Sequence, residues 1–314
     1  MSPRDQVKPP KRRQASHPAP PTIALIGFGE VGQTLAPDLW AQGVDDLAAW
    51  DRLFSVSSSG PRRTINACAQ VKAARSMASA VAGRNIVICA VTAGNCITVA
   101  REAAASLAPN TFYLDLNSVS PQTKKAAAEI ITAAGGRYVE AAVMSPVAPR
   151  RIASPILICG PHATAFLPLA RTVGFSGMRH FGPIIGRAAA AKMCRSMMIK
   201  GLEALFLESL LTARRHGVVD TVLESLHDLF PHEQWESVAH YFISRSLQHG
   251  VRRSEEMTEA ARTAAEIGVE PLMSVACAMR QEWAALNRPP RLSTNLTALL
   301  DGVLATDADL LESA

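Results

Sequence analysis

The chain of 314 residues lacks long hydrophobic runs and paired cysteines, and each absence excludes a class of protein. No apolar run approaches the roughly 18 residues of a membrane-spanning helix, so we expect neither a membrane span nor a membrane partner. No cysteine stands in a C-x-x-C pair or near histidine at ligand spacing, so we predict no metal site. Two cysteines lie inside apolar runs, which favours buried thiols in a reducing compartment, the cytoplasm. The six are Cys68, Cys89, Cys96, Cys159, Cys194 and Cys277.

Excess positive charge is also missing from most of the chain. The formal net charge is +5, and residues 1–21 carry five basic side chains against one acid, a net +4. The body therefore holds too little charge to attract a polyanion, and we predict no nucleic-acid partner. Residues 1–21 are rich in proline and lack the apolar core of a signal peptide. Their composition predicts a disordered basic tail, with a functional basic arm as the alternative.

A glycine-rich segment follows an apolar run at residues 22–26 and precedes a helical pattern at residues 31–40. This context places three glycines in a strand-to-helix turn. Gly27 would permit the tight turn, Gly29 the approach of a pyrophosphate, and Gly32 close packing of helix on strand. A helix N-terminus at this point favours an anion. The alternative is a strand–turn–helix with no ligand. The predicted dinucleotide-binding residues are Gly27, Phe28, Gly29, Glu30, Val31 and Gly32.

A second strand at residues 47–50 ends at Asp51, which stands 19 positions after Gly32. This spacing is typical of the carboxylate that binds an adenosine ribose. Such a carboxylate accepts the ribose 2′-hydroxyl and repels a 2′-phosphate, so Asp51 favours NAD as the cofactor. Arg52 follows directly and leaves NADP as the alternative.

Strand-like and helix-like segments alternate up to about residue 185. Further apolar runs at residues 86–91, 112–116, 138–143 and 156–159 predict strands, and residues 97–107 and 121–134 predict helices. This alternation predicts an α/β Rossmann domain over residues 22–185, with a mostly parallel, doubly wound sheet. Residues 186–314 instead read as helices at 188–215, 219–229, 233–247, 252–266, 271–286 and 293–304. They predict a long connecting helix and an all-α domain, with breaks at Pro231 and Gly250 among others.

Several short motifs occur in the order found in one known superfamily. The chain resembles the β-hydroxyacid dehydrogenases and 6-phosphogluconate dehydrogenases, in the branch with a phosphogluconate-dehydrogenase-like helical domain. Beyond the glycine-rich segment, the resemblance rests on residues 91–93, 116–121, 140–145, 186–194, 252–259 and 268–271. It implies an oxidoreductase that transfers a hydride between a nicotinamide cofactor and a small polar β-hydroxy acid or a related polyol acid.

The resemblance assigns the chemistry to Lys192, in the alanine-rich beginning of the long helix. Oxidation of an alcohol needs a base for the hydroxyl proton, and a lysine serves if burial and nearby positive charge lower its pKa. The alternative is a lysine that extends along the helix surface to solvent. The resemblance also implies cofactor contacts at Val91, Thr92 and Asn117. The substrate contacts that it implies are Ser118, Ser145 and Ser196.

Two departures from the family pattern concern the substrate. Relatives usually have serine and two glycines where this chain has Met144-Ser145-Pro146, and Pro146 has no N–H to donate. Relatives often have asparagine where this chain has Ser196, which has a shorter reach. Two alternative functions stay open: an imine reductase of the same fold, which tends to lack the lysine, and a non-catalytic dinucleotide-binding protein.

The long helix carries more apolar surface than one amphipathic stripe needs. Since the resembled family pairs through its helical domains, we predict a homodimer formed in this way. The alternative is that the later helices bury the surface within one chain. The apolar residues are Met193, Met197, Met198, Leu202, Leu205, Phe206 and Leu210.

Overall fold

The computed structural model describes residues 20–228, 231 and 234–312. It divides into two compact units, one ending at Lys192 and the other beginning at Met193, each described here by itself. Most of the predicted basic tail, residues 1–19, lies outside the described residues. In the described part of the chain, no helix combines the length and the apolar character needed to cross a membrane.

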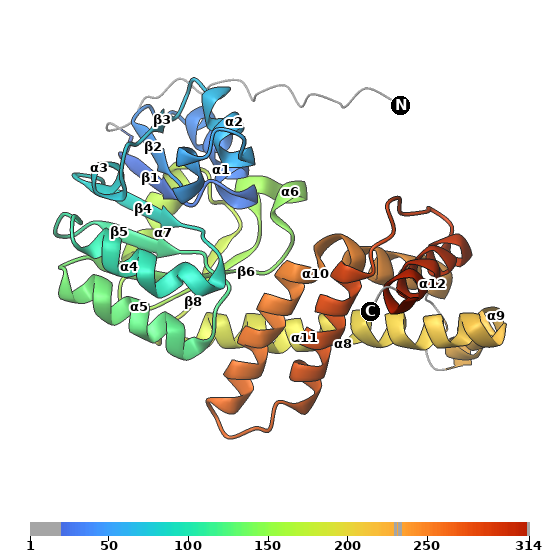
Figure 1. The fold of residues 1–314 in the computed structure, drawn as a ribbon. Helices are drawn as coiled ribbons and strands as arrows, with labels where there is room; N and C mark the ends of the chain where they lie inside the picture. The colour runs from blue at the N-terminus through green and yellow to red at the C-terminus, as the bar shows by residue number, and fades with distance from the viewer. Residues whose placement is uncertain (1–19, 229–230, 232–233, 313–314) are drawn as a thin grey trace. The chain divides into compact units, whose positions relative to one another are not determined.

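The first unit contains an eight-stranded sheet in the order β3-β2-β1-β4-β5-β6-β7-β8 (Figure 1). All neighbouring strands are parallel except β6 and β7, which are antiparallel. The chain order reverses between β1 and β4, the place where open α/β sheets bind ligands at the carboxyl ends of their strands. The strands are β1 (Ile23–Ile26), β2 (Leu47–Trp50), β3 (Lys72–Ala73), β4 (Ile86–Cys89), β5 (Phe112–Asp115), β6 (Arg137–Val143), β7 (Ile156–Cys159) and β8 (Met178–Gly182).

Two hydrophobic cores cover the two faces of this sheet. In β1, Ile23 and Leu25 belong to one core, and Ala24 and Ile26 belong to the other. Successive side chains of a strand point to opposite faces, so a strand buried on both sides must be apolar throughout. The structure therefore confirms the predicted fold class. The helices are α1 (Glu30–Ala41), α2 (Gly60–Asn66), α3 (Met77–Val81), α4 (Cys96–Ala104), α5 (Pro121–Ala133), α6 (Val147–Arg150) and α7 (Ala163–Thr172), with 3-10 turns η1 (Arg52–Ser55), η2 (Ala93–Asn95) and η3 (Arg151–Ala153).

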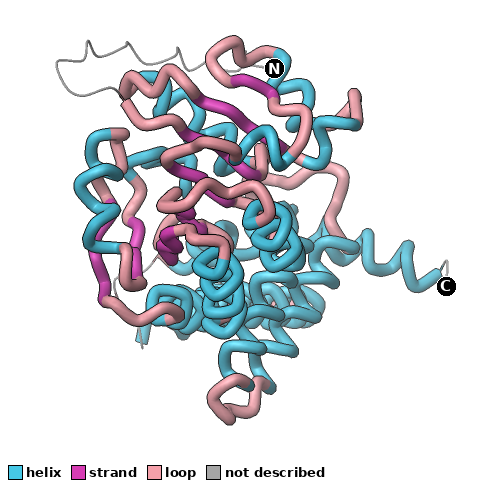
Figure 2. Tube along the Cα trace, turned by 90° about the vertical axis from the view of Figure 1, so that its left-hand side faces the viewer, coloured by secondary structure: helices cyan, strands magenta, loops and turns pink. Residues whose placement is uncertain are grey.

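The second unit is helical in its described part, and all eight strands belong to the first unit (Figure 2). Helix α8 (Arg187–His216) begins in the first unit and continues into the second. The core of the second unit includes Leu207, Trp235, Ile243 and Leu300. The other elements are α9 (Val219–Ser225), η4 (Leu226–Asp228), α10 (Trp235–Ala265), α11 (Leu272–Leu286) and α12 (Leu296–Glu312).

The predicted helix break at Gly250 corresponds to a kink in α10. Two helical stretches meet at His249, the residue before Gly250, where φ is −129° and ψ is 17°. A Cβ atom on Gly250 would lie 2.4 Å from the carbonyl oxygen of Gln281 in α11. The glycine therefore allows the two helices to approach each other closely.

Candidate active site

The three glycines between β1 and α1 have different surroundings. A Cβ on Gly27, whose φ is +88°, would lie 2.3 Å from the carbonyl oxygen of Ala90, and one on Gly32 would lie 2.4 Å from that of Gly27. These two glycines allow close approach of backbone to backbone. Gly29 is the N-cap of α1, and apart from its two neighbours in the chain no residue has an atom within 4 Å of the position of its Cβ. The open space at a helix N-terminus suits a phosphate.

The other residues of this loop have distinct environments. Phe28 is buried, and its ring forms a T-shaped pair with the ring of Phe54, with the centroids 5.8 Å apart. Glu30 is exposed in the first turn of α1, and Val31 packs against the core. The side chain of Phe28 thus anchors the loop, and its backbone N–H contacts Asp51.

Asp51 joins the glycine loop to the segment after β2. Its Oδ2 accepts a hydrogen bond from the N–H of Phe28 at 2.7 Å, and its Oδ1 accepts one from that of Leu53 at 2.8 Å. A carboxylate oxygen has two lone pairs, so each oxygen retains the capacity to accept a ribose hydroxyl. Arg52 is exposed beside it.

A pocket of about 290 Å³ lies at the carboxyl ends of β1, β2 and β4. It brings together six of the predicted cofactor residues from three separate segments. These are Gly27, Gly29, Asp51, Arg52, Val91 and Thr92. The open space at Gly29 and the carboxylate of Asp51 fit the pyrophosphate and the ribose of a dinucleotide.

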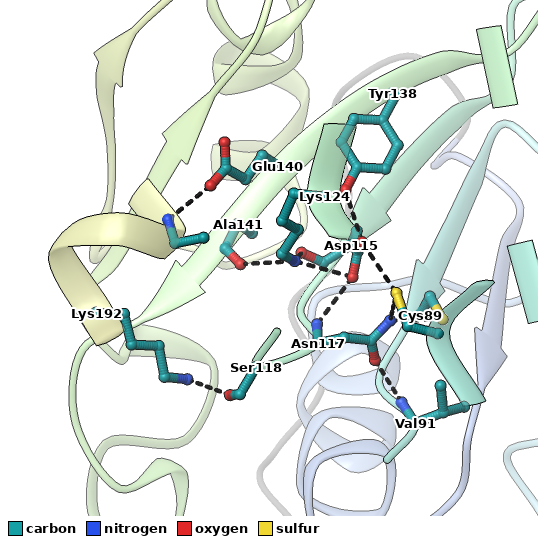
Figure 3. A network of polar contacts seen from close by, with 12 residues as sticks. Cys89, Val91, Asp115, Asn117, Ser118, Lys124, Tyr138, Glu140, Ala141 and Lys192 are labelled. Atoms are coloured by element: carbon teal, nitrogen blue, oxygen red, sulfur yellow. Dashed lines mark hydrogen bonds and ion pairs between the residues drawn. The ribbon is translucent and has the colours of Figure 1, made fainter. Parts of the chain in front are cut away.

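Asn117 is buried in the turn after β5 and ties this turn to β4 (Figure 3). Its Oδ1 accepts a hydrogen bond from the N–H of Val91 at 2.7 Å. Its Nδ2 lies 3.4 Å from Sγ of Cys89 and 3.5 Å from Sγ of Cys96. The amide therefore shapes the pocket wall through Val91, and direct contact with the cofactor stays a prediction.

A buried charge cluster lies beneath this turn (Figure 3). Oδ1 of Asp115 accepts the N–H of Asn117 at 2.9 Å and forms a 3.0 Å ion pair with Lys124. Oδ2 of Asp115 accepts the hydroxyl of Tyr138 at 2.6 Å. Burial and the negative charge of Asp115 raise the pKa of Tyr138, so the tyrosine remains a donor. Asp115 and Lys124 are almost fully buried, so the cluster fixes the turn in a water-free region.

A second buried carboxylate, Glu140 in β6, holds the beginning of α8. Its Oε2 accepts the N–H of Gly186 and its Oε1 accepts that of Ala189, both at 2.6 Å. Burial raises the pKa of Glu140, while the charge of Lys124 and the two backbone N–H groups oppose this shift. Analysis of the sequence missed the roles of Lys124, Tyr138 and Glu140.

Lys192 and Ser118 meet although 74 positions separate them in the chain. Nζ of Lys192, on α8, donates a hydrogen bond to Oγ of Ser118 at 2.6 Å, and both side chains are half-buried. This contact places an ammonium group at the carboxyl end of β5, beside the turn that carries Asn117. The arrangement can present the ammonium to an oxygen atom of a bound molecule.

The other two predicted substrate residues have different partners. Ser145 is half-buried, and its hydroxyl donates to the carbonyl oxygen of Pro146 at 3.1 Å. Ser196 belongs to the second unit, where its buried hydroxyl accepts a 3.0 Å hydrogen bond from Nζ of Lys200. Their contact with substrate stays a prediction.

Two family models match successive parts of the chain. The NAD binding domain of 6-phosphogluconate dehydrogenase matches residues 22–171. A domain of unknown function (DUF1932) matches residues 213–284.

Several relatives match most of this chain and nearly all of their own length. A conserved hypothetical protein from Sinorhizobium meliloti is 36% identical over 91% of this chain and 96% of its own, with a TM-score of 0.72. A second relative is a conserved protein of unknown function, described as structurally similar to 3-hydroxyacid dehydrogenases. It is 30% identical over 84% of this chain and 98% of its own, with a TM-score of 0.64. An uncharacterized 28.5 kDa protein from Methanothermus fervidus is 26% identical over 80% of this chain and 94% of its own.

Named enzymes are more distant and show the fold alone. A 3-hydroxyisobutyrate dehydrogenase from Mycobacterium tuberculosis is 18% identical over 90% of this chain and 98% of its own, with a TM-score of 0.66. An imine reductase from Myxococcus stipitatus is 16% identical over 90% and 99%, with a TM-score of 0.55.

Proposed function

Because the chain belongs to the 6-phosphogluconate dehydrogenase-like superfamily of NAD(P)-binding proteins, in the branch with the DUF1932 helical domain, we propose that it is a dehydrogenase. It oxidises the CH–OH group of a small polar β-hydroxy acid or a related polyol acid. The observation that carries this proposal is the 2.6 Å contact between Lys192 and Ser118.

Lys192 moves the proton of the reacting hydroxyl. In the oxidation its neutral amine takes this proton, and in the reduction its ammonium returns a proton to the carbonyl oxygen. The nicotinamide, when bound, supplies or accepts the hydride. Ser118 holds the lysine nitrogen and orients it, and the hydroxyl of Ser118 also contacts the substrate.

The substrate is held differently from that of relatives with a serine and two glycines after β6. Pro146 has no N–H, and the hydroxyl of Ser145 donates to the carbonyl oxygen of Pro146. A carboxylate held only by backbone N–H groups is therefore disfavoured here. We propose that Ser118, Ser145 and Ser196 supply hydroxyl contacts to the polar groups of the substrate.

We propose NAD as the preferred cofactor, bound by the glycine loop, Asp51, Val91, Thr92 and Asn117. The support is the carboxylate of Asp51 in the pocket, with capacity left for a ribose hydroxyl. Asp51→Ala should narrow the preference for NADH over NADPH, measured by titration of each nucleotide. A preference of the unmodified protein for NADPH would instead assign Arg52, in the same pocket, to a 2′-phosphate.

The lysine assignment is tested with two substitutions and a control. A screen of hydroxy acids that follows NADH absorbance identifies a substrate. Lys192→Ala should then lower kcat by about 10²-fold or more, the scale of a positioned acid–base group. Lys192→Arg should be equally slow, because it keeps the charge but cannot release a proton at working pH. Lys72→Ala, an exposed lysine on β3, should leave kcat unchanged.

The results separate the proposal from its alternatives. Near-normal turnover of Lys192→Ala would remove the lysine from the reaction. Reduction of C=N substrates without alcohol oxidation would favour an imine reductase. Nucleotide binding without turnover of any hydroxy acid or C=N substrate would favour a non-catalytic protein.

We also propose that the protein is a cytoplasmic homodimer. All six cysteines are free thiols, which suits a reducing compartment. On the second unit, Leu202, Leu205, Phe206 and Tyr241 line an apolar groove of about 690 Å³. A second copy of the chain, presenting the same helices, would cover it.

A further inference from the structure

Asp115 and Glu140 lie opposite each other in the register of the parallel strands β5 and β6. Both carboxylates are fully buried, and in-register residues of neighbouring strands point to the same face of the sheet. Lys124 forms an ion pair with Asp115, and its charge also acts on Glu140. Two buried acids thus share one buried cation, an arrangement that requires every oxygen to be well bonded.

The two acids hold opposite sides of the contact between Lys192 and Ser118 (Figure 3). Asp115 holds the turn after β5, because its Oδ1 accepts the N–H of Asn117, the residue before Ser118. Glu140 holds the beginning of α8 through the N–H groups of Gly186 and Ala189. Ala189 stands three residues before Lys192, less than one helical turn.

A carboxylate suits this helix end better than any neutral side chain. The first N–H groups of a helix have no acceptor within the helix, and the N-terminus carries partial positive charge. The two oxygens of Glu140 satisfy one N–H group each, at a depth where water cannot replace them. No residue in the first turn of α8 is acidic, so this charge comes from another element of the fold.

We propose that Glu140 is a positioning residue, which fixes the first turn of α8 and thereby the lysine nitrogen at Ser118. The inference rests on the proposed function of Lys192. It predicts that the loss of one acceptor oxygen of Glu140 displaces Lys192. The cofactor pocket should stay unchanged, because it lies at β1, β2 and β4.

Glu140→Gln tests this inference, because an amide keeps the shape but turns an N–H group toward one of the two backbone donors. We expect kcat to fall at least tenfold, while the dissociation constant for NADH changes less than twofold. Glu140→Asp keeps the charge but draws both oxygens back by about 1.5 Å, so it should recover part of kcat. Glu129→Gln, an exposed acid on α5, is the matched control and should leave both quantities unchanged.

A readout independent of turnover is the NMR signal of ¹³C-methylated Lys192, identified by its loss in Lys192→Arg. Glu140→Gln should shift this signal and speed amide hydrogen exchange at Gly186 and Ala189. A shifted signal in a protein without dehydrogenase activity would support the positioning role and reject the proposed function. Normal kcat with an unchanged signal in Glu140→Gln would overturn the positioning role and leave the proposed function intact. Should Glu140→Gln fail to fold, an unchanged signal and unchanged kcat in Glu140→Asp would overturn it equally.

Discussion

Substitution of single glycines in the turn between β1 and α1 should separate folding from cofactor binding. Gly27→Ala and Gly29→Ala each add one methyl group, two positions apart. The methyl group on residue 27 would lie 2.3 Å from the carbonyl oxygen of Ala90, whereas that on residue 29 would meet no atom within 4 Å beyond its two neighbours in the chain. Gly27→Ala should therefore lower the stability of the fold, and Gly29→Ala should lower the affinity for the nucleotide.

The expected magnitudes follow from this geometry. At residue 27 the φ of +88° costs an L-residue about 1–2 kcal/mol, and relief of the contact with Ala90 adds about 1–3 kcal/mol. Gly83→Ala is the matched control, because Gly83 has a φ of +68° with no atom within 4 Å, and it should show the backbone strain alone. Gly29 has a φ of −80°, which alanine adopts without strain, but alanine is a poorer N-cap than glycine, so Gly29→Ala should change the free energy of unfolding by less than about 1 kcal/mol.

Two measurements decide the outcome. Urea unfolding without nucleotide gives the free energy of unfolding, and calorimetric titration with NADH gives the affinity. Gly29→Ala should bind NADH at least tenfold more weakly, about 1.4 kcal/mol, because its methyl group occupies the space assigned to the pyrophosphate. Wild-type affinity in Gly29→Ala would refute the placement of the pyrophosphate. Wild-type stability in Gly27→Ala would refute the close approach to Ala90.

Three further predictions concern the buried charges, the thiols and the assembly. Lys124→Met should lower the free energy of unfolding by about 3–5 kcal/mol, because it leaves the carboxylate of Asp115 buried without a cation. Urea unfolding measures this loss, and a value below about 1 kcal/mol would contradict the prediction. Burial raises the pKa of the Cys89 thiol from 9.0 to about 11. Between these pH values only the unfolded state releases this proton, so stability should fall as pH rises, by up to about 1.4 kcal/mol per pH unit. The slope should be smaller in Cys89→Ala, and an equal slope would refute this contribution. Light scattering at micromolar concentration should give a mass near twice 33.5 kDa, whereas a fully active monomer would refute the proposed homodimer.

The strands that could be predicted from sequence are those buried on both faces. The predicted bounds of β2 and β7 agree with the structure. Short, continuous apolar runs of this kind are typical of strands that are buried on both faces. The two-residue β3 is exposed, and β8 contains the exposed residues Arg179 and His180, so neither shows such a run. Their positions depend on pairing with β2 and β7, which is a tertiary property.

The same distinction applies to the candidate site. The glycine loop and Asp51 are local in sequence, and their spacing predicts the pocket that the structure forms. The resemblance assigned Lys192 and Ser118 to the substrate one by one, but their contact was not predicted, because no local pattern joins residues 74 positions apart. Gly250 shows both kinds of information, because the local rule placed a helix break within one residue of the kink at His249, whereas the close packing on α11 has no local signal.

One signal in the sequence could have revealed the buried charges. Asp115 and Glu140 each stand within apolar strands, and a carboxylate in such a place must be bonded or paired, since burial of an unpaired charge is very unfavourable. That argument requires partners but does not identify them. Lys124 reaches Asp115 from α5, and the N–H groups that bind Glu140 come from the beginning of α8. The register that sets the two acids side by side is a property of the sheet. An acid inside an apolar strand is therefore a reason to look for a helix end or a buried cation opposite it.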